Sequence, residues 1–190
     1  MKNFKPYQQG KLDNLCGIYA IVNAIRWGNL KSPRVRFSFD ECEALVQEMI
    51  SCLEGQDRLY STLKEGLMIP DMSFLLKATT KWLLENKDIA QVTDKPFHSA
   101  SDLPMSSLTD KVNSHLSTPK SSAILVTTGD LDHWTVPIKV NLTRLNFADS
   151  YGIPSIKTKD CSCSAFSVQS SKKYKIIPSG LFLLSFSGTN

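Results

Sequence analysis

The sequence lacks a long apolar segment. No apolar run approaches the roughly 18–20 residues that span a bilayer, and no apolar stretch follows the basic N-terminus as in a secretory signal peptide. The closest run, Gly180–Phe186, is about as long as one buried strand. We therefore expect no membrane partner and a cytoplasmic protein, or one delivered by a route without a classical signal peptide.

The sequence also has few cysteines, few histidines and little net charge. Its five cysteines are an odd number at irregular spacings, which argues against a disulfide framework and for a reducing compartment. The 22 Lys and Arg exceed the 18 Asp and Glu by only four, and they form no stripe that could follow a phosphate backbone. We expect no nucleic-acid partner. The three histidines leave few candidates for a catalytic base.

The periodicity of apolar residues changes along the chain. Hydrophobic residues make up 42% of the 190, enough for one compact domain with a sizeable core. Helical spacing predominates in about 1–120 and strand spacing in about 121–190. This order predicts a single α+β domain over 1–190, with a helical part followed by an antiparallel sheet.

Individual elements follow from the same patterns. The expected helices are about Asn14–Trp27, Phe39–Leu53, Met72–Glu85 and Ser107–Leu116. Their expected caps are Asp13 or Asn14, then Ser38 with Glu41 as a capping box, then Asp71. The expected strands are Ser122–Thr128, Trp134–Val140, Thr143–Ala148 and Gly180–Phe186, with Tyr174–Ile177 as a further candidate. The Ser- and Lys-rich segment Tyr151–Lys173 is expected to be a surface loop.

Cys16 lies in the first turn of the first expected helix. The unpaired backbone N–H groups and the positive end of the helix dipole favour the thiolate there, and the thiolate is the nucleophile. Gly17 would leave room for a substrate carbonyl to approach the backbone. The alternative is a small core residue, since free cysteines are often buried. The position of Cys16 at a helix start and the glycine after it make the nucleophile about as well supported as the core residue, before any catalytic base is considered.

The other cysteines favour structural roles. Cys42 and Cys52 fall on the apolar stripe of the second expected helix, so we expect both in the core. Cys161 and Cys163 form a C-x-C pair in the expected loop, but a structural zinc ion takes four ligands and no further Cys or His lies nearby in sequence. We expect neither a metal nor a cofactor.

A cysteine hydrolase needs a histidine base and a group that orients it. His133 begins a strand and stands beside Trp134, whereas His98 lies in a polar linker and His115 ends a weak helix where it should face solvent. Asp149 ends the next strand. Alone, His133 could be an ordinary strand histidine and Asp149 a turn former. Together with Cys16 they indicate a catalytic triad.

Strand register offers a geometric test of that triad. A hairpin with the three-residue loop Val140–Leu142 would pair Lys139 with Thr143 and place His133 directly across from Asp149 on the same face. A slip of one residue would turn one side chain away. Pro137 cannot donate to the ladder, so it predicts a bulge or an edge position.

At this point the sequence resembles the papain-like cysteine peptidase superfamily. The segments that carry the resemblance are Asp13–Ala24, Asp132–Trp134 and Ala148–Gly152. The order Cys, His, Asp and the separation of 16 residues between His133 and Asp149 also fit it. The region between about Gly28 and Ser121 carries no motif that assigns a subfamily.

The resemblance implies a papain-like fold, in which a central N-terminal helix carries Cys16 and packs on an antiparallel sheet. It implies a Cys16–His133 thiolate–imidazolium pair oriented by Asp149. It also implies a glutamine before the cysteine that donates to the oxyanion. Gln9 is the favoured candidate and Gln8 the alternative, with the backbone N–H of Cys16 as the second donor.

The implied function is hydrolysis of an amide or isopeptide bond in a protein substrate, by a peptidase or by an isopeptidase acting on ubiquitin-like tails. A protein glutamine deamidase of the effector or toxin type would use the same triad, and a related transferase would replace water with an amine. A catalytically silent papain-like binding module is the non-enzymatic alternative. Arg34–Phe39 and Tyr151–Lys173 are candidate partner contacts, although solvated loops explain them as well.

Overall fold

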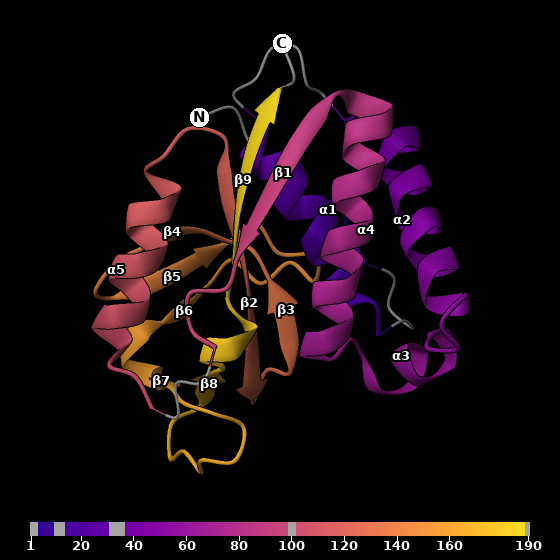
Figure 1. Cartoon of the computed structure of the whole chain (residues 1–190). Helices are drawn as coiled ribbons and strands as arrows, with labels where there is room; N and C mark the ends of the chain where they lie inside the picture. Colours follow the sequence, from indigo (N-terminus) through magenta and orange to yellow (C-terminus); the bar gives the residue numbers. More distant parts are fainter. Residues whose placement is uncertain (1–3, 10–13, 31–36, 99–101, 189–190) are drawn as a thin grey trace.

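The computed structural model describes residues 4–9, 14–30, 37–98 and 102–188 (Figure 1). Its helices are α1 Cys16–Gly28, α2 Phe39–Glu54, α3 Leu59–Glu65, α4 Ile69–Lys87 and α5 Met105–Leu116. Its strands are β1 Ile89–Asp94, β2 Ser121–Gly129, β3 His133–Thr135, β4 Pro137–Val140, β5 Arg144–Phe147, β6 Ser155–Lys157, β7 Cys161–Cys163, β8 Tyr174–Ile176 and β9 Phe182–Gly188. Two short 3₁₀ turns are η1 Thr158–Asp160 and η2 Pro178–Gly180.

The strands form two sheets. The larger has the order β1-β9-β2-β8-β7 with β3 also paired to β2, and the smaller has the order β4-β5-β6. The pairings are antiparallel except that of β7 with β8, which is parallel. The predicted α+β class with antiparallel strands is therefore confirmed, with one parallel pair added.

Helices cover both faces of the larger sheet (Figure 1). Helices α1, α2 and α4 lie on one side and α5 on the other. Successive residues of β2 alternate between two apolar clusters: Ile124 and Val126 pack with α1, whereas Ala123 and Leu125 pack with α5. Burial of both faces explains why β2 reads as a continuous apolar run.

Helix α1 occupies the centre of the first cluster. Ile18, Ile21 and Ile25 are fully buried on it, and the helix contacts β2, β3 and β9. These isoleucines repeat at helical spacing, so they present one apolar face to the sheet. The expectation of a buried helix near the N-terminus is confirmed, and it carries Cys16 at its first position.

Two helix starts differ from expectation. Helix α1 begins at Cys16 after Leu15, and Asn14 donates instead to the backbone oxygens of Leu63 and Lys64. The alternative cap, Asp13, lies outside the described residues, as do residues 34–36 of the expected partner segment Arg34–Phe39. The capping box of Ser38 and Glu41 on α2 is confirmed.

Helix α4 begins three residues before the expected Met72. Pro70 lies in its first turn, where a backbone N–H would have no partner within the helix, so the N–H that proline lacks removes no helical hydrogen bond. Asp71 is therefore not the cap itself. Its carboxylate accepts the backbone N–H of Met68 at 3.1 Å and pairs with Arg58 at 2.8 Å.

Two expectations are wrong, the wholly helical first part and the loop at Tyr151–Lys173. Strand β1 lies within the expected helical part and forms an edge of the larger sheet. The expected loop Tyr151–Lys173 contains β6, η1 and β7. Its buried residues alternate with partly exposed Ser and exposed Lys, so the strands are too short and too polar to stand out. In the described residues, no helix is both long enough and apolar enough to cross a membrane.

Candidate active site

Cys16 lies in the first turn of α1, as expected, and is its first residue rather than its third; its side chain is partly buried. The helix therefore points its unpaired N–H groups toward the region around the thiol. The N-cap residue is Leu15, whose apolar side chain makes no capping hydrogen bond. The thiol is near enough to the His133 side chain to favour its protonated form.

Gly17 does not leave room for a substrate, contrary to expectation. A Cβ atom at this position would stand 2.5 Å from Leu67 Cδ1 and 3.1 Å from the Met72 methyl group. Leu67 is itself buried, and its carbonyl oxygen accepts a 2.7 Å hydrogen bond from the Trp134 indole N–H. The glycine is needed because the segment before α4 packs directly on α1.

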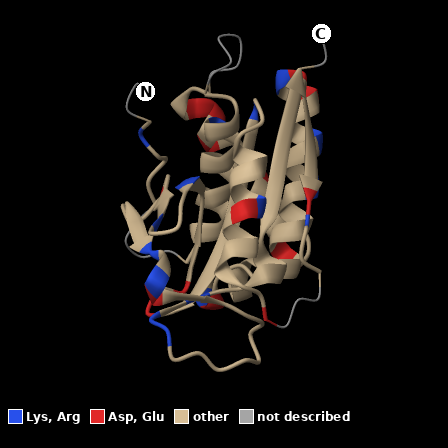
Figure 2. Cartoon of the chain, turned by 90° about the vertical axis from the view of Figure 1, so that its left-hand side faces the viewer, with Lys and Arg blue, Asp and Glu red and all other residues tan. Residues whose placement is uncertain are grey.

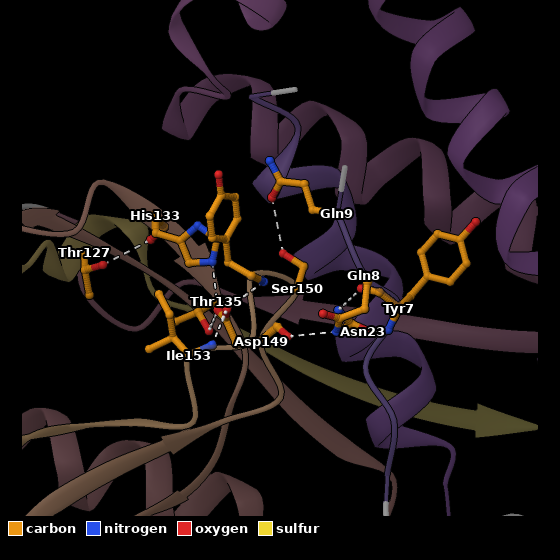
Figure 3. A network of polar contacts seen from close by, with 11 residues as sticks. Tyr7, Gln8, Gln9, Asn23, Thr127, His133, Thr135, Asp149, Ser150 and Ile153 are labelled. Carbon is orange, nitrogen blue, oxygen red and sulfur yellow. Dashed lines mark hydrogen bonds and ion pairs between the residues drawn. The ribbon is translucent and has the colours of Figure 1, made fainter. Parts of the chain in front are cut away.

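His133 lies at the start of β3 and is 5% exposed. Its Nε2–H donates to Asp149 Oδ2 at 2.7 Å (Figure 3), which leaves Nδ1 for the Cys16 thiol. Burial of the ring lowers its pKa, but the hydrogen bonds to Asp149 and Cys16 outweigh burial and raise the pKa to about 9. The imidazole is therefore held in the protonated form at neutral pH.

Four donors surround the carboxylate of Asp149, which is 3% exposed. His133 and the Thr135 hydroxyl both donate to Oδ2 at 2.7 Å, and the backbone N–H groups of Tyr151 and Ile153 donate to Oδ1 at 2.8 and 3.2 Å. Burial raises the pKa of Asp149, but the bond to His133 and the other donors bring it below its usual value. The carboxylate is thus fixed in its charged form.

The predicted register of the hairpin is wrong, although the predicted contact forms. Lys139 pairs with Asn146 rather than Thr143, and the register shifts between Pro137 and Lys139. On the side of the irregularity toward β3, the Val136 backbone oxygen accepts the Ala148 N–H. This pairing places Thr135 opposite Asp149. His133 lies two residues further along the same face, because side chains alternate with period two. At this end of the hairpin the observed pairing is displaced from the predicted pairing by an even number of residues. The side chain of His133 therefore still faces the carboxylate.

Thr135 is a site residue that the sequence analysis did not identify. The sequence could have indicated this residue, because residues i and i+2 of a strand share a face and Thr135 is two residues after His133. The expected register assigned that position opposite Asp149 to His133 instead.

The N-terminal segment brings Gln9 beside the triad. Buried Asn23 on α1 holds this segment, accepting the Tyr7 N–H at 2.6 Å and donating to the Tyr7 oxygen at 3.0 Å. The Gln9 N–H then donates to the Ser150 backbone oxygen at 3.1 Å, and the Ser150 hydroxyl donates to Gln9 Oε1 at 3.4 Å (Figure 3). This orients the amide so that its nitrogen points away from Ser150.

Gln8 is oriented differently. Its amide nitrogen donates to the backbone oxygens of Pro6 at 3.2 Å and Asp149 at 3.4 Å. Through these bonds, Gln8 attaches the N-terminal segment to the turn after β5. Of the two candidate oxyanion donors, the geometry favours Gln9.

Aromatic rings flank the base. The exposed ring of Tyr151 stands edge-on to His133, with 5.9 Å between ring centroids. Trp134 is buried and packs on Phe182 of β9. The imidazole therefore lies beneath Tyr151, while the strand that carries it is anchored in the core.

The remaining histidines do not reach this site. His98 is exposed. His115 does not face solvent as expected: its Nε2–H is within 3.1 Å of the Ser122 oxygen and 2.9 Å of the Leu184 oxygen, so it ties α5 to β2 and β9. Two carbonyl acceptors require the proton on Nε2.

The remaining cysteines are structural. Cys42 is buried as expected, and Cys52 is partly buried against the same cluster. Cys161 and Cys163 are not in a polar loop but on β7, facing the second cluster, where burial raises the pKa of both to about 12. Across the described ranges, no three His, Cys, Asp or Glu side chains form a group that could hold a metal ion.

No protein-family model matches this sequence, and no curated protein matches it at a significant level. Function must therefore be inferred from the geometry of the chain's own residues.

Proposed function

We propose that this protein is a papain-like cysteine hydrolase that cleaves an amide or isopeptide bond in a protein substrate. One observation carries the proposal: Cys16, His133 and Asp149 come from three separate segments, yet His133 donates to Asp149 at 2.7 Å and Cys16 is near enough to raise the pKa of the same imidazole. A partly exposed thiol next to a protonated, carboxylate-bound imidazole is the arrangement that nucleophilic catalysis requires.

The chemistry is acyl transfer in two steps. The Cys16 thiolate adds to the substrate carbonyl carbon, and the C=O electron pair moves to oxygen. His133 Nδ1–H then protonates the amine, the C–N bond breaks and a thioester remains. Water adds to the thioester with Nδ1 as base, the C–S bond breaks, and a carboxylic acid and the thiolate are released.

Two groups are proposed to stabilise the oxyanion. The backbone N–H of Cys16 is at the first turn of α1, where it has no partner within the helix. The Gln9 amide, oriented by Ser150, is the second donor. Gln9→Ala should lower turnover about a hundredfold without changing the reactivity of Cys16 toward a small alkylating agent.

The reactivity of Cys16 tests the first step. The native protein is treated with limiting iodoacetamide at about pH 5.5, and the labelled cysteines are identified by mass spectrometry. We expect Cys16 to react first. Cys52 is the internal control, because it is also partly buried, but burial and the nearby Glu48 carboxylate raise its pKa.

A matched pair of histidine variants completes this test. His133→Ala should slow labelling of Cys16 about tenfold or more, whereas the exposed His98→Ala should not. Equal labelling of Cys16 and Cys52 in the unmodified protein would contradict the proposal.

The products decide which amide is attacked. The protein and its Cys16→Ala variant are incubated with a cell proteome, and the peptides are compared by mass spectrometry. New chain termini or released ubiquitin-like tails support hydrolysis of a peptide or isopeptide bond. Conversion of Gln to Glu would identify a deamidase instead. Identical peptide sets, with Cys16 unreactive, would identify a silent binding module.

A further inference from the structure

Strands β5 and β6 carry a group of cations away from the triad. A hollow of about 300 Å³ is lined by Leu142, Thr143, Arg144, Lys157 and Lys159, hereafter the basic hollow. These side chains lie opposite the face that packs in the core, because their neighbours Leu145 and Ile156 are buried. Basic segments gather in this region at the lower left of Figure 2, above the long loop.

Two of these cations face each other across the strands. Arg144 pairs directly with Lys157 in the antiparallel register of β5 and β6. Directly opposed like charges destabilise a sheet. The Ser155 hydroxyl accepts a 2.8 Å hydrogen bond from Arg144 Nη1, which orients the guanidinium along β6.

No acidic side chain of the described residues forms an ion pair with Arg144, Lys157 or Lys159. The nearest in sequence, Asp160, takes part in no ion pair with them. Lys172 adds a further cation, since its ammonium donates to the Lys159 carbonyl at 3.0 Å. The repulsion in the basic hollow is thus not compensated by the described part of the chain.

We propose that the basic hollow binds an acidic peptide segment of a partner protein. A carboxylate between Arg144 and Lys157 would accept hydrogen bonds from both and remove their repulsion. Leu142, 83% exposed at the rim, offers an apolar contact for a peptide. None of the described residues that line the hollow is aromatic, so they offer no platform on which nucleic-acid bases could stack. This function is separate from hydrolysis and does not depend on Cys16.

Fluorescence anisotropy tests the proposal. The probe is a fluorescein-labelled decapeptide of alternating Glu and Gly, titrated with the full chain at low salt. We expect saturable binding that weakens as salt is added. The double variant R144E/K157E should weaken binding about tenfold or more and should bind a Lys-Gly decapeptide instead. The control K77E/K111E makes the same change of net charge at exposed positions on α4 and α5 and should bind like the unmodified protein.

The single variant K157E separates a binding surface from a structural one. It places a carboxylate opposite Arg144, so the melting temperature should rise by about 1–3 °C while binding of the Glu-Gly peptide weakens. Cys16→Ala should bind the peptide normally, so failure of the hydrolase proposal would leave this result intact.

Three outcomes would overturn the proposal. These are no saturable binding of the Glu-Gly peptide, equal weakening by K77E/K111E, and binding of an oligo-dT strand as tight as that of the peptide. The last would identify a general polyanion surface.

Discussion

Among single residues, Thr135 completes the set of donors around the Asp149 carboxylate. Thr135→Val keeps the side-chain shape but removes one of the two hydrogen bonds to Oδ2. We expect the pKa of Asp149 to rise and the protein to lose about 2 kcal/mol of stability, because a hydrogen bond to a charged group is lost. Denaturant unfolding measures the second effect.

The pH dependence of Cys16 alkylation separates a positioning role from a purely structural one. With a higher Asp149 pKa, the carboxylate is protonated earlier on acidification and no longer supports the imidazolium. The acid limb of the alkylation profile should therefore move to higher pH in Thr135→Val. Thr135→Ser keeps the hydroxyl and should restore the original limb. An unmoved limb with reduced stability would limit Thr135 to a structural role.

Single residues show what the sequence could and could not predict about the site. Cys16, His133 and Asp149 could be chosen from helix position, strand position and spacing, and the structure brings them together. The structural role of Gly17 could not be predicted, because Leu67, which occupies the space beside it, is 50 residues away in sequence. The role of Thr135 depended on a register that Pro137 shifts. Such contacts between distant segments leave no periodic signal.

At the scale of elements, the segment before α4 ties α1 to β3. Leu67 packs on Gly17 and accepts the Trp134 indole N–H. Gly17→Ala should cost about 1–3 kcal/mol of stability by overpacking and should slow alkylation of Cys16, because the start of α1 must shift. Urea unfolding and the labelling rate measure the two effects.

Gly28→Ala is the matched control for that change. Its Cβ would stand 2.3 Å from Phe186, at the far end of α1. It should destabilise the protein without slowing the alkylation of Cys16. In the double variant Gly17→Ala/Leu67→Ala, the losses of stability from the two substitutions should be less than additive, because the shortened side chain at position 67 makes room for the added methyl group. Strict additivity would show that the two residues do not compete for this space.

The N-terminal segment is a second element with a testable connection. Asn23→Ala removes both hydrogen bonds to Tyr7 and should cost about 1–3 kcal/mol, because buried backbone groups lose their partners. Since Gln9 follows on the same segment, turnover of an identified substrate should fall while alkylation of Cys16 persists. Combining Asn23→Ala with Gln9→Ala should lower turnover no further than Gln9→Ala alone.

Asn29→Ala is the control for the segment. Asn29 is also buried and directly follows α1, but its amide donates to the Ile25 oxygen of that helix. Its loss should lower stability and leave turnover unchanged. An equal fall in turnover for both variants would mean that Asn23 acts only through general stability.

Elements with strong local signals were predictable and the others were not. α2 carries an apolar stripe and a capping box, and both agree with the structure. β6 and β7 have three residues each and alternate Ser or Lys with buried side chains, so composition suggested a loop. Their strand conformation is fixed by pairing with β5 and β8 rather than by local preference.

At the scale of the whole molecule, the candidate site joins parts of the chain that fold together only in the complete structure. Cys16 comes from the helix at the centre of one apolar cluster, whereas Asp149 follows a strand whose buried residues belong to the other cluster. The protonation of the His133–Asp149 pair should therefore be visible in the global stability, because unfolding separates the two groups.

The sign of that effect follows from the two pKa shifts. The pKa of His133 is raised from 6.5 to about 9, so its contribution is fully present below pH 6.5 and is lost as the pH rises through 9. The pKa of Asp149 is lowered from 3.8, so its contribution is present above that pH and is lost on further acidification. The pair should stabilise the fold most between these limits. The alkaline loss should reach at most about 3 kcal/mol.

Urea unfolding from pH 5 to about pH 10 measures this loss. His133→Gln cannot titrate, so the difference in stability between it and the unmodified protein should shrink as the pH rises from about 6.5 to 9. Cys16→Ala removes one cause of the raised pKa of His133 and should move the loss to lower pH. The exposed His98→Gln should follow the unmodified protein throughout. If His133→Gln instead ran parallel to the unmodified protein over this range, His133 would not carry its charge in the folded state, and the thiolate–imidazolium pair would have to be abandoned.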